Sequence, residues 1–354
     1  LLFLCEFDGD AAALCPRNVL ARTLERAADM GYTAHAAFEY EFFLFNETPH
    51  SVRQKNYQNL QPITPGFFGY SMLRNSVHAE LYQELLDMGE AMGFPIEGLH
   101  TETGPGVIEA ALVVDEAGNA ADKAALFKTF TKVWAQRRDL MATFMAKWSN
   151  DYPGQSGHIH VSLRHKDDGR SAFFDPDQPL TMSDTQRHFI GGQQRYMPEL
   201  LAMVASTVNA YTRLVPGFWA PTDATWGCEN RTTALRLIPG SDSSQRVEYR
   251  VGPADANPYL ALSAALASGL AGIAEGLEPE PMVEGNAYDQ THPGHLALPQ
   301  SLSDATALFK HSRTARSLFG DAFVDHFAAS RQWEASEHRK HMCDWELQRY
   351  FEII

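Results

Sequence analysis

Residues 38–45 read FEYEFFLF, which places Glu39 and Glu41 inside an aromatic and aliphatic run. Side chains alternate across a β-strand, so these two glutamates share one face and lie about 7 Å apart. Phe38, Tyr40 and Phe42 then point to the opposite, apolar face. For this strand alone two interpretations are open: glutamates exposed to water on a half-buried strand, or carboxylates gathered at a site.

Three further segments repeat this alternation of an apolar and a polar face: SGHIHVSLR (156–164), NRTTALRLIPG (230–240) and QRVEYRVG (245–252). The polar residues that stand out in these segments are His158, His160, Ser162, Arg231, Arg236, Arg246, Glu248 and Arg250. A coincidence of solvated strand faces is the alternative. The recurrence favours a curved sheet whose polar, concave face forms one site.

Between the strands, periodic apolar residues predict helices over 17–30, 76–92, 124–148, 186–211 and 259–277. Residues 46–75 are expected to form a long loop, and residues 96–111 a strand-like stretch. The elements interleave without regular βαβ spacing or a Gly-rich phosphate loop, which disfavours Rossmann and P-loop architectures. The sequence therefore predicts an α+β fold: a curved, mainly antiparallel sheet, or partial barrel, flanked by helices.

The residue types on the polar face predict a chemistry. Glutamates and a neutral histidine are ligands for Mg²⁺ or Mn²⁺, and crowded carboxylates need such cations or take up a proton. Segment 96–112, IEGLHTETGPGVIEAAL, adds Glu97, Glu102 and Glu109 around a Gly-Pro-Gly turn that can bring the last two together. An ordinary turn with solvated acids is the other interpretation of that segment. Arginines bind phosphates or carboxylates, and metal ions beside arginines are the components of phosphoryl transfer.

Composition narrows the function classes. The chain has 354 residues and a formal net charge of −15 without a basic stripe, which argues against a nucleic-acid partner. Its four cysteines are scattered without a metal-binding spacing, so we expect free thiols and a cytoplasmic protein. Residues 258–274 are apolar but rich in Ala and Gly, which favours a buried packing helix over a membrane span. Because the chain starts LLFLCEF, in a strand-like run without methionine, we expect residues upstream of Leu1.

Six motifs together resemble the catalytic domain of the glutamine synthetase family, in order and spacing, over nearly the whole chain (1–354). They are FEYEFFLF, HTETGPGVIEA, SGHIHVS, RLVPGFWAP, ENRTTALR and RVEYRVGPADANPYLALSAALASGL. The resemblance implies a ligase in which ATP phosphorylates the γ-carboxylate of glutamate and an amine then displaces the phosphate. It also implies two Mg²⁺ or Mn²⁺ ions at each site.

Carried over motif by motif, the resemblance implies a first metal held by Glu41, Glu102 and Glu109. The second metal is then held by Glu39, His158 and Glu248. The implied glutamate-binding residues are Gly154, Arg213, Arg231 and Arg250, and the arginines at 231 and 250 are also expected to act in catalysis. The implied ATP-binding residues are Glu97, His160, Ser162, Arg236 and Arg246.

The sequence departs from ammonia-using members at the flap that follows Arg213. Those members carry a glutamate that helps take a proton from ammonium, whereas RLVPGFWAP places Trp219 there. An indole accepts no proton, but it can cover a reactive acyl phosphate and pack on an alkyl chain or a cation. Trp219 as a packed loop aromatic is the other interpretation. Together with Gly-Val-Ile at 106–108 in place of a Gly-Gln pair, this tryptophan favours a larger amine, either a polyamine such as putrescine or spermidine or a monoamine, and a polyamine is expected.

Two other functions stay open: a glutamate–ammonia ligase, and a non-catalytic homologue, against which the complete set of six implied metal ligands argues. Tyr288 in GNAYDQ resembles a tyrosine that some bacterial members adenylylate, but a tyrosine in a solvated loop is the favoured interpretation. The family carries a small β-grasp domain before the catalytic domain, which we expect to lie upstream of Leu1. It also assembles two stacked hexameric rings with active sites between subunits, so a dodecamer or a hexamer is expected.

Overall fold

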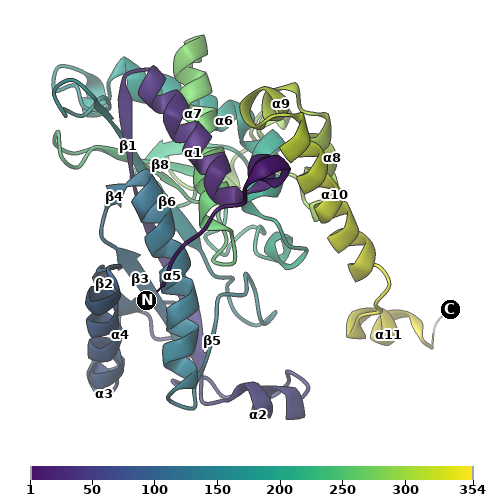
Figure 1. Cartoon of the computed structure of the whole chain (residues 1–354). Coiled ribbons are helices and arrows are strands. Elements are labelled where there is room, and N and C mark those ends of the chain that lie inside the picture. Colours follow the sequence, from purple (N-terminus) through teal and green to yellow (C-terminus); the bar gives the residue numbers. More distant parts are fainter. Residues whose placement is uncertain (1, 353–354) are drawn as a thin grey trace.

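The computed structural model describes residues 2–352 and is built around one open, nine-stranded sheet (Figure 1). The strands are β1 (Tyr32–Phe45), β2 (Ile96–Thr101), β3 (Val107–Leu112), β4 (Asp115–Glu116), β5 (Met141–Thr143), β6 (Gly157–His165), β7 (Trp226–Cys228), β8 (Leu235–Ile238) and β9 (Arg246–Tyr249). They follow the order β2-β3-β1-β6-β9-β8-β7, with β4 and β5 paired to β1. These pairs are antiparallel except β7–β8, so the expected mainly antiparallel sheet is confirmed.

The helices flank the sheet and pack on one another. They are α1 (Pro16–Asp29), α2 (Pro49–Gln54), α3 (Met72–Val77), α4 (Ala79–Met92), α5 (Ala117–Gln136), α6 (Asp184–Val204), α7 (Pro258–Glu275), α8 (Leu302–His311), α9 (Arg313–Phe319), α10 (Asp321–His338) and α11 (Asp344–Tyr350). Helices α8, α9 and α10 lie together on one side of the molecule, and α11 extends away from the body (Figure 1).

One face of the sheet carries the main core. On β1, Ala36, Phe38 and Tyr40 are buried on this face, together with Ile159 and Val161 of β6. Helix α5 packs along β1 here (Figure 1), and the Phe127 ring on α5 stacks on that of Tyr40 at a centroid distance of 6.1 Å. Because side chains alternate, the same packing turns the intervening polar residues of both strands to the opposite face.

Several predicted boundaries were wrong. The helix expected over 124–148 begins at Ala117 and ends at Gln136, because Asp139 adopts a positive φ of 54° and the chain then forms β5 against β1. Residues 46–75 contain α2 and most of α3 rather than only loop. The stretch 96–111 is a hairpin of β2 and β3, and the helix expected over 186–211 ends at Val204 before a short 3₁₀ turn at Asn209–Thr212.

Helix α7 is long and apolar enough, by length and composition, to cross a membrane, but 72% of it is buried within the fold. It packs closely on α6: a Cβ added at Gly192 would lie 2.6 Å from Gly272 Cα. The buried packing helix expected over 258–274 is therefore confirmed. All four cysteines are unpaired, as expected.

Candidate active site

The polar faces of five strands meet on the side of the sheet opposite the main core. The register places Glu39 of β1 opposite His158 of β6, and Glu41 of β1 opposite Glu109 of β3. On the other side of β6, His160 lies opposite Glu248 of β9, which in turn lies opposite Arg236 of β8. The strand periodicity read from the sequence thus predicted the shared face correctly.

These side chains line one hollow with a volume of about 470 Å³. Of the residues singled out in the sequence, the hollow is lined by Glu39, Glu41, Glu102, Glu109, Gly154, His158, Arg213, Trp219, Arg231, Arg236, Glu248 and Arg250. The four expected ATP-binding residues that do not line it are Glu97, His160, Ser162 and Arg246. Glu97 is exposed near the start of β2, whereas the other three continue the polar face along β6 and β9.

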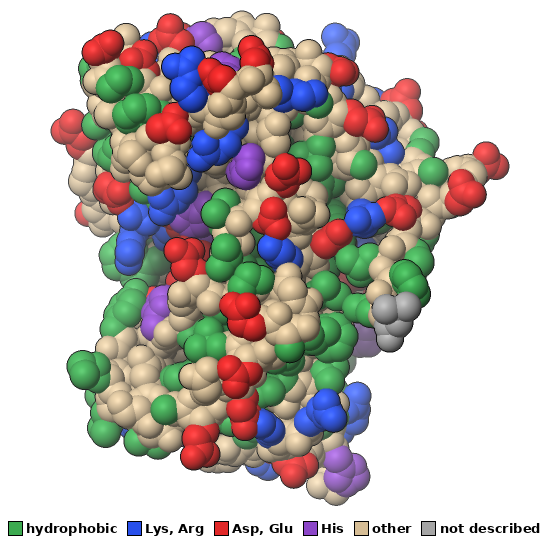
Figure 2. Space-filling view, turned by 60° about the vertical axis from the view of Figure 1, so that its left-hand side comes forward, with side chains coloured by type: hydrophobic (Ala, Val, Ile, Leu, Met, Phe, Trp, Pro, Cys, Tyr) green, Lys and Arg blue, Asp and Glu red, His purple; other side chains and the backbone are tan. Residues whose placement is uncertain are grey.

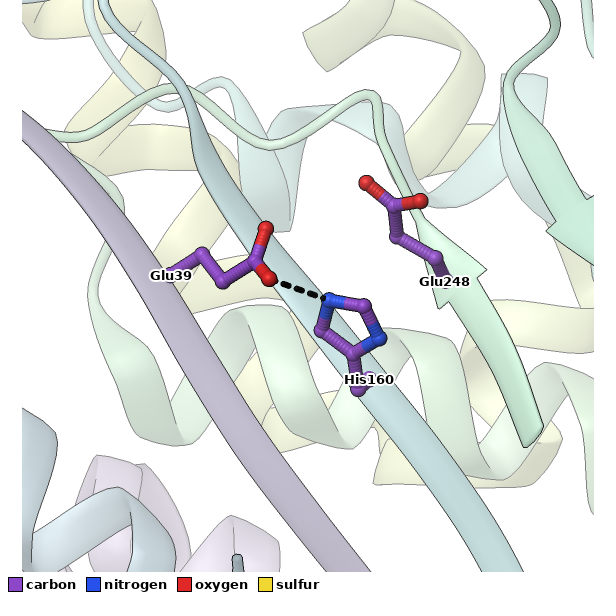
Figure 3. A group of neighbouring side chains, drawn as sticks. All are labelled: Glu39, His160 and Glu248. Atoms are coloured by element: carbon purple, nitrogen blue, oxygen red, sulfur yellow. Dashed lines mark ion pairs between the residues drawn. The ribbon is translucent and has the colours of Figure 1, made fainter. Parts of the chain in front are cut away.

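One cluster of possible metal ligands spans three neighbouring strands (Figure 3). Ligand atoms of Glu39, His160 and Glu248 lie within 4.8 Å of one another, and Nε2 of His160 is 3.0 Å from Oε1 of Glu39. His158 joins them, with Nδ1 3.1 Å from Oε1 of Glu248 and 3.8 Å from Oε2 of Glu39. His160 therefore lies as near to these carboxylates as His158 does, although the family resemblance implied a role for it in binding ATP. Its Nδ1 accepts a hydrogen bond from Nε of Arg246 at 3.1 Å.

Glu248 is at the centre of a charge network, with 1% of the residue exposed. Its carboxylate accepts a 3.0 Å hydrogen bond from Nη1 of Arg236 and a further one from Arg250. Burial alone would raise the pKa of Glu248. The hydrogen bond from His158 and the nearby positive charges outweigh burial and hold that pKa well below its usual range. Burial would also raise the pKa of Glu39, but hydrogen bonds and charges from His158 and His160 outweigh burial and lower that pKa.

A second cluster lies at the β2–β3 hairpin. Ligand atoms of His100, Glu102 and Glu109 lie within 4.8 Å of one another, and Nε2 of His100 is 3.2 Å from Oε1 of Glu102. The Gly-Pro-Gly turn therefore brings the two glutamates together, as predicted. The hydroxyl of Tyr70 donates to Oε1 of Glu102 at 2.5 Å, and its ring stacks on His100 at 5.1 Å. Glu41 faces this cluster from β1, where its Oε2 accepts from the backbone N of Ser156 at 2.7 Å.

His100 and Tyr70 were missed at the sequence level. His100 stands on β2 two residues before Glu102, which directly follows the end of that strand, so the short spacing in GLHTETG was an available signal. Tyr70 lies before α3, at a positive φ of 56°, in a segment without strand or helix periodicity. Only the tertiary structure places it against Glu102.

The donor set of the hollow fits divalent cations. Burial, and then the charges of Glu41, Glu39 and other nearby glutamates, raise the pKa of Glu109 to about 9. Nε2 of His158 is buried without a hydrogen-bond partner. Crowded carboxylate oxygens and an unpartnered imidazole nitrogen are what Mg²⁺ or Mn²⁺ would bind and neutralise.

Arginines form the wall beside these acids. Arg213 is buried, and its guanidinium donates to the backbone O of Val251 at 3.0 Å and of Arg250 at 3.3 Å. Burial lowers the pKa of Arg213 to about 10. At Gly154, an added Cβ would lie 2.7 Å from both the Ala146 O and the Arg213 Cγ, so no other residue fits there without a shift. The backbone at this position consequently lies directly against the arginine.

The flap contributes two aromatic side chains to the lining of the hollow. Trp219 is 59% exposed with a φ of 57°, and Phe218 beside it also lines the hollow. The Nζ of Lys147 lies 4.9 Å from the centroid of the Phe218 ring. Tyr288 is half-buried rather than solvated, because its hydroxyl donates to the backbone O of Ala220 in the flap at 3.1 Å, and this corrects the solvated-loop interpretation.

Comparison with known proteins agrees with this geometry. The family model described as "Glutamine synthetase, catalytic domain" matches residues 13–350 of this chain. Type-1 glutamine synthetase 2 of Dictyostelium discoideum is 42% identical, over 100% of this chain and 68% of that protein. Glutamate–isopropylamine ligase of a Pseudomonas species is 35% identical, over 99% of this chain and 77% of that protein. The gamma-glutamylethanolamide synthetase GlnA4 of Streptomyces coelicolor is 38% identical, over 98% and 73%.

Among solved structures, GmaS without ligand superimposes with a TM-score of 0.85 at 28% identity, covering 96% of this chain and 77% of that one. The fold, the hollow and these matches define an ATP-dependent carbon–nitrogen ligase that uses glutamate. The chain belongs to the glutamine synthetase family. Members of this family use ATP and divalent metal ions, for which the hollow has fitting ligands.

Proposed function

We propose that this protein joins the γ-carboxylate of glutamate to an amine other than ammonia, through γ-glutamyl phosphate made with ATP. The observation that carries the proposal is Trp219, which lines the hollow. The family resemblance implies a glutamate at this flap position in ammonia-using members. An indole has no basic atom to take a proton from ammonium, whereas it can cover an acyl phosphate and contact an alkyl chain. Relatives named for isopropylamine and for ethanolamide support an amine acceptor.

The proposed roles follow the two clusters. Glu41, Glu102 and Glu109 would hold one Mg²⁺ or Mn²⁺, with His100 beside them, and Glu39, His158 and Glu248 the other. Bound there, the two ions would offset the negative charge of ATP and of the γ-phosphoryl group. All six side chains face one hollow, which supports this assignment.

The chain's own residues bind and orient the substrates. Arg213, held by two backbone carbonyls beside Gly154, is placed to bind the α-carboxylate of glutamate. Arg231 and Arg250, on the wall of the hollow, would stabilise charge on the γ-carboxylate and on the phosphoryl group in transfer. The unprotonated amine nitrogen would then attack the acyl carbon and the bond from that carbon to the phosphate oxygen would break. The departing phosphate would take up the proton that the nitrogen loses, and Trp219 would keep water out.

ATP is proposed to extend from the hollow along the polar face of β6 and β9. His160 and Arg246 are hydrogen-bonded to each other on this path, and the register places Ser162 beyond them. Arg236 would bind a phosphate once Glu248 holds a metal. Glu97 stands exposed on β2, with β3 and β1 between it and β6, and so lies apart from the other three.

A glutamate–ammonia ligase is the second candidate. The observation that favours it is the 42% identity to a glutamine synthetase, the highest identity among the relatives named above. Between the amine classes, the sequence favoured a polyamine. The names of the relatives instead point to monoamines, isopropylamine and ethanolamine.

We further propose that 1–354 is one catalytic domain, preceded in the whole protein by a β-grasp domain that completes the amine pocket of a neighbouring subunit. The assembly would be a dodecamer or a hexamer in the cytoplasm. On the face shown in Figure 2, Lys and Arg side chains lie among Asp and Glu side chains rather than in an extended basic stripe, which supports the expectation of no nucleic-acid partner. Size-exclusion chromatography with light scattering would test the oligomeric state.

A panel of amines assayed for phosphate release from ATP and glutamate tests the function. We expect alkylamines to exceed ammonium in kcat/KM. Trp219→Glu should shift the preference toward ammonium, because it restores a carboxylate that can take a proton. Strong turnover with ammonium and none with other amines would refute the proposal. If Trp219→Glu has the same relative kcat/KM for each amine as the wild type, Trp219 does not determine the acceptor.

A further inference from the structure

The polar face of the sheet ends in an apolar row. Along β1, the register pairs Glu41 with Glu109 and, one step further, Phe43 with Val107. Residues two apart on paired strands share a face, so the second row lies about 7 Å beyond the first. Phe43 and Val107 both line the hollow. The face thus changes from carboxylates to hydrocarbon within one pleat.

This apolar row belongs to a separate packed cluster. Phe43, Phe45 and Val107 form a small core on the polar side of the sheet, apart from the main core on the other side. The Phe43 ring packs edge-on against Trp148 at 5.6 Å. A Cβ added at Gly104 would lie 3.1 Å from the Phe43 ring. The wall is therefore held rigidly from two sides.

The row lies at the end of the hollow away from the proposed nucleotide path. Going along β1, the face meets Ser162 opposite His35, then the clustered glutamates, and last the row of Phe43 and Val107. The flap aromatics Phe218 and Trp219 line the hollow as well. An acceptor that reaches the acyl group from the side away from ATP meets this hydrocarbon.

A second ammonium group would find no carboxylate at this end of the hollow, among the described residues, outside the proposed metal-ligand sets. Five carboxylates line the hollow among the described residues, and all five belong to the proposed metal-ligand sets: Glu39, Glu41, Glu102, Glu109 and Glu248. Bound metal ions would neutralise them. Lys147 lies against the flap, with its Nζ 4.9 Å from the centroid of the Phe218 ring, and its charge would repel the distal ammonium of a diamine.

We infer that the acceptor is a primary monoamine with a short uncharged chain, which packs between the Phe43–Val107 row and the flap, rather than a diamine or polyamine. This inference rests on the proposed function and narrows it. It assigns Val107 a role in specificity: its side chain excludes a charged group from the acceptor end. Burying an ammonium against such a wall without a partner is unfavourable, whereas burying methylene groups there is favourable.

The decisive comparison uses n-butylamine and putrescine, which differ by one terminal amino group on the same four-carbon chain. With the purified protein, ATP, glutamate and Mg²⁺, we expect kcat/KM for n-butylamine to exceed that for putrescine by about tenfold or more. Val107→Glu should narrow or reverse this ratio through the KM for the amine, while the KM for glutamate stays unchanged. Val133→Glu, on the exposed side of α5, is the matched control and should leave the ratio as in the wild type.

The outcomes separate the two proposals. A preference for putrescine over n-butylamine in the wild type would overturn this inference and leave the proposed function standing. A preference for ammonium over every alkylamine would overturn both. Because Val107→Glu places a charge at a buried site and could fail to fold, Lys147→Met gives a second test. This substitution removes a positive charge that would repel the distal ammonium of putrescine. It should raise kcat/KM for putrescine about two- to fivefold without changing kcat/KM for n-butylamine. An equal change for both amines would count against the inference.

Discussion

Glu248 contacts charged or titratable side chains from several segments: Arg236 of β8, His158 of β6, and Arg250 just beyond β9. A carboxylate buried among such partners is costly to remove, because each partner loses the charge that offsets its own desolvation. The same carboxylate is a proposed metal ligand. The two roles are compatible, since Arg236 and Arg250 could pair with phosphate instead if a cation were bound to Glu248.

Glu248→Ala should lower metal-dependent phosphate release by at least about 100-fold, because it removes a proposed direct ligand rather than a supporting residue. The assay is phosphate release from ATP with glutamate and amine present. Glu278→Ala is the matched control, since Glu278 also contacts an arginine and a histidine, Arg187 and His188, but at an exposed position. Near-normal turnover in Glu248→Ala would contradict the metal-ligand assignment.

Much of this site could be predicted from single residues because strand alternation is a local rule. Glu39, His158 and Glu248 each stand in a segment whose apolar partners fix the buried face, so their direction follows from the sequence. The position of His160 among the carboxylates could not be assigned in the same way. Both histidines of HIH face the hollow's side of β6, and only the register between strands shows which carboxylates each one meets.

At the level of elements, α5 ties the sheet to the loop that precedes α7. Lys128 of α5 donates from Nζ to the backbone O of Ala256 at 2.8 Å and lies 5.3 Å from the Tyr40 ring centroid. The charge of Asp255 acts to raise the pKa of Lys128, and the charge of Lys132 acts to lower it. Burial lowers the pKa of Lys128 to about 7. This half-buried lysine thus contacts both β1 and the segment that follows Arg250.

This burial predicts a pH dependence of stability. The unfolded chain keeps the lysine proton up to about pH 10.4, whereas the folded protein releases it near pH 7. Between these values the unfolded state binds more protons, so the contribution of Lys128 to the free energy of unfolding rises with pH, by at most about 1.4 kcal/mol per pH unit. Lys128→Met should lose that rise. Urea unfolding from pH 7.5 to 9.5 measures it, with the exposed Lys340→Met as a control that keeps the wild-type slope. Equal slopes in the wild type and Lys128→Met would contradict the prediction.

Element boundaries were harder to predict than element faces. Sequence periodicity carried the expected helix past Gln136 because Phe144 and neighbouring apolar residues continue the pattern. In the structure Phe144 directly follows β5, because residues 141–143 pair with the end of β1. Its buried ring lies beside the ring of Phe42. A long-range pairing overrides local propensity there, and a single sequence does not reveal such a pairing.

At the scale of the whole molecule, strand register orders the residues of the polar face. Ser162 lies at one end, the paired carboxylates lie in the middle, and the Phe43–Val107 row lies at the other end, where we propose that the acceptor binds. This order is set by strand register alone. Five glutamates in one hollow of a chain with a net charge of −15 also repel one another, so the folded protein without metal carries an electrostatic cost.

Divalent ions should therefore stabilise the fold. A ligand that binds only the folded state adds about 2.7 kcal/mol at 100 times its Kd, which for a chain of this size corresponds to a rise in Tm of a few degrees. We expect the protein treated with chelator to melt lower than the same protein with Mn²⁺ or Mg²⁺. Titration followed by Mn²⁺ paramagnetic resonance should show two ions per chain, one for each proposed ligand set.

Single-residue changes separate the two ions. Glu39→Ala removes a ligand of one set only, so it should leave one Mn²⁺ bound and reduce the rise in Tm by about half. Glu278→Ala serves again as the control with both ions retained. If the wild type binds no more than one Mn²⁺ per chain, or if Tm is the same with chelator and with metal, the crowded carboxylates are held by protons and arginines rather than by a pair of cations, and the proposed phosphoryl-transfer site loses its central component.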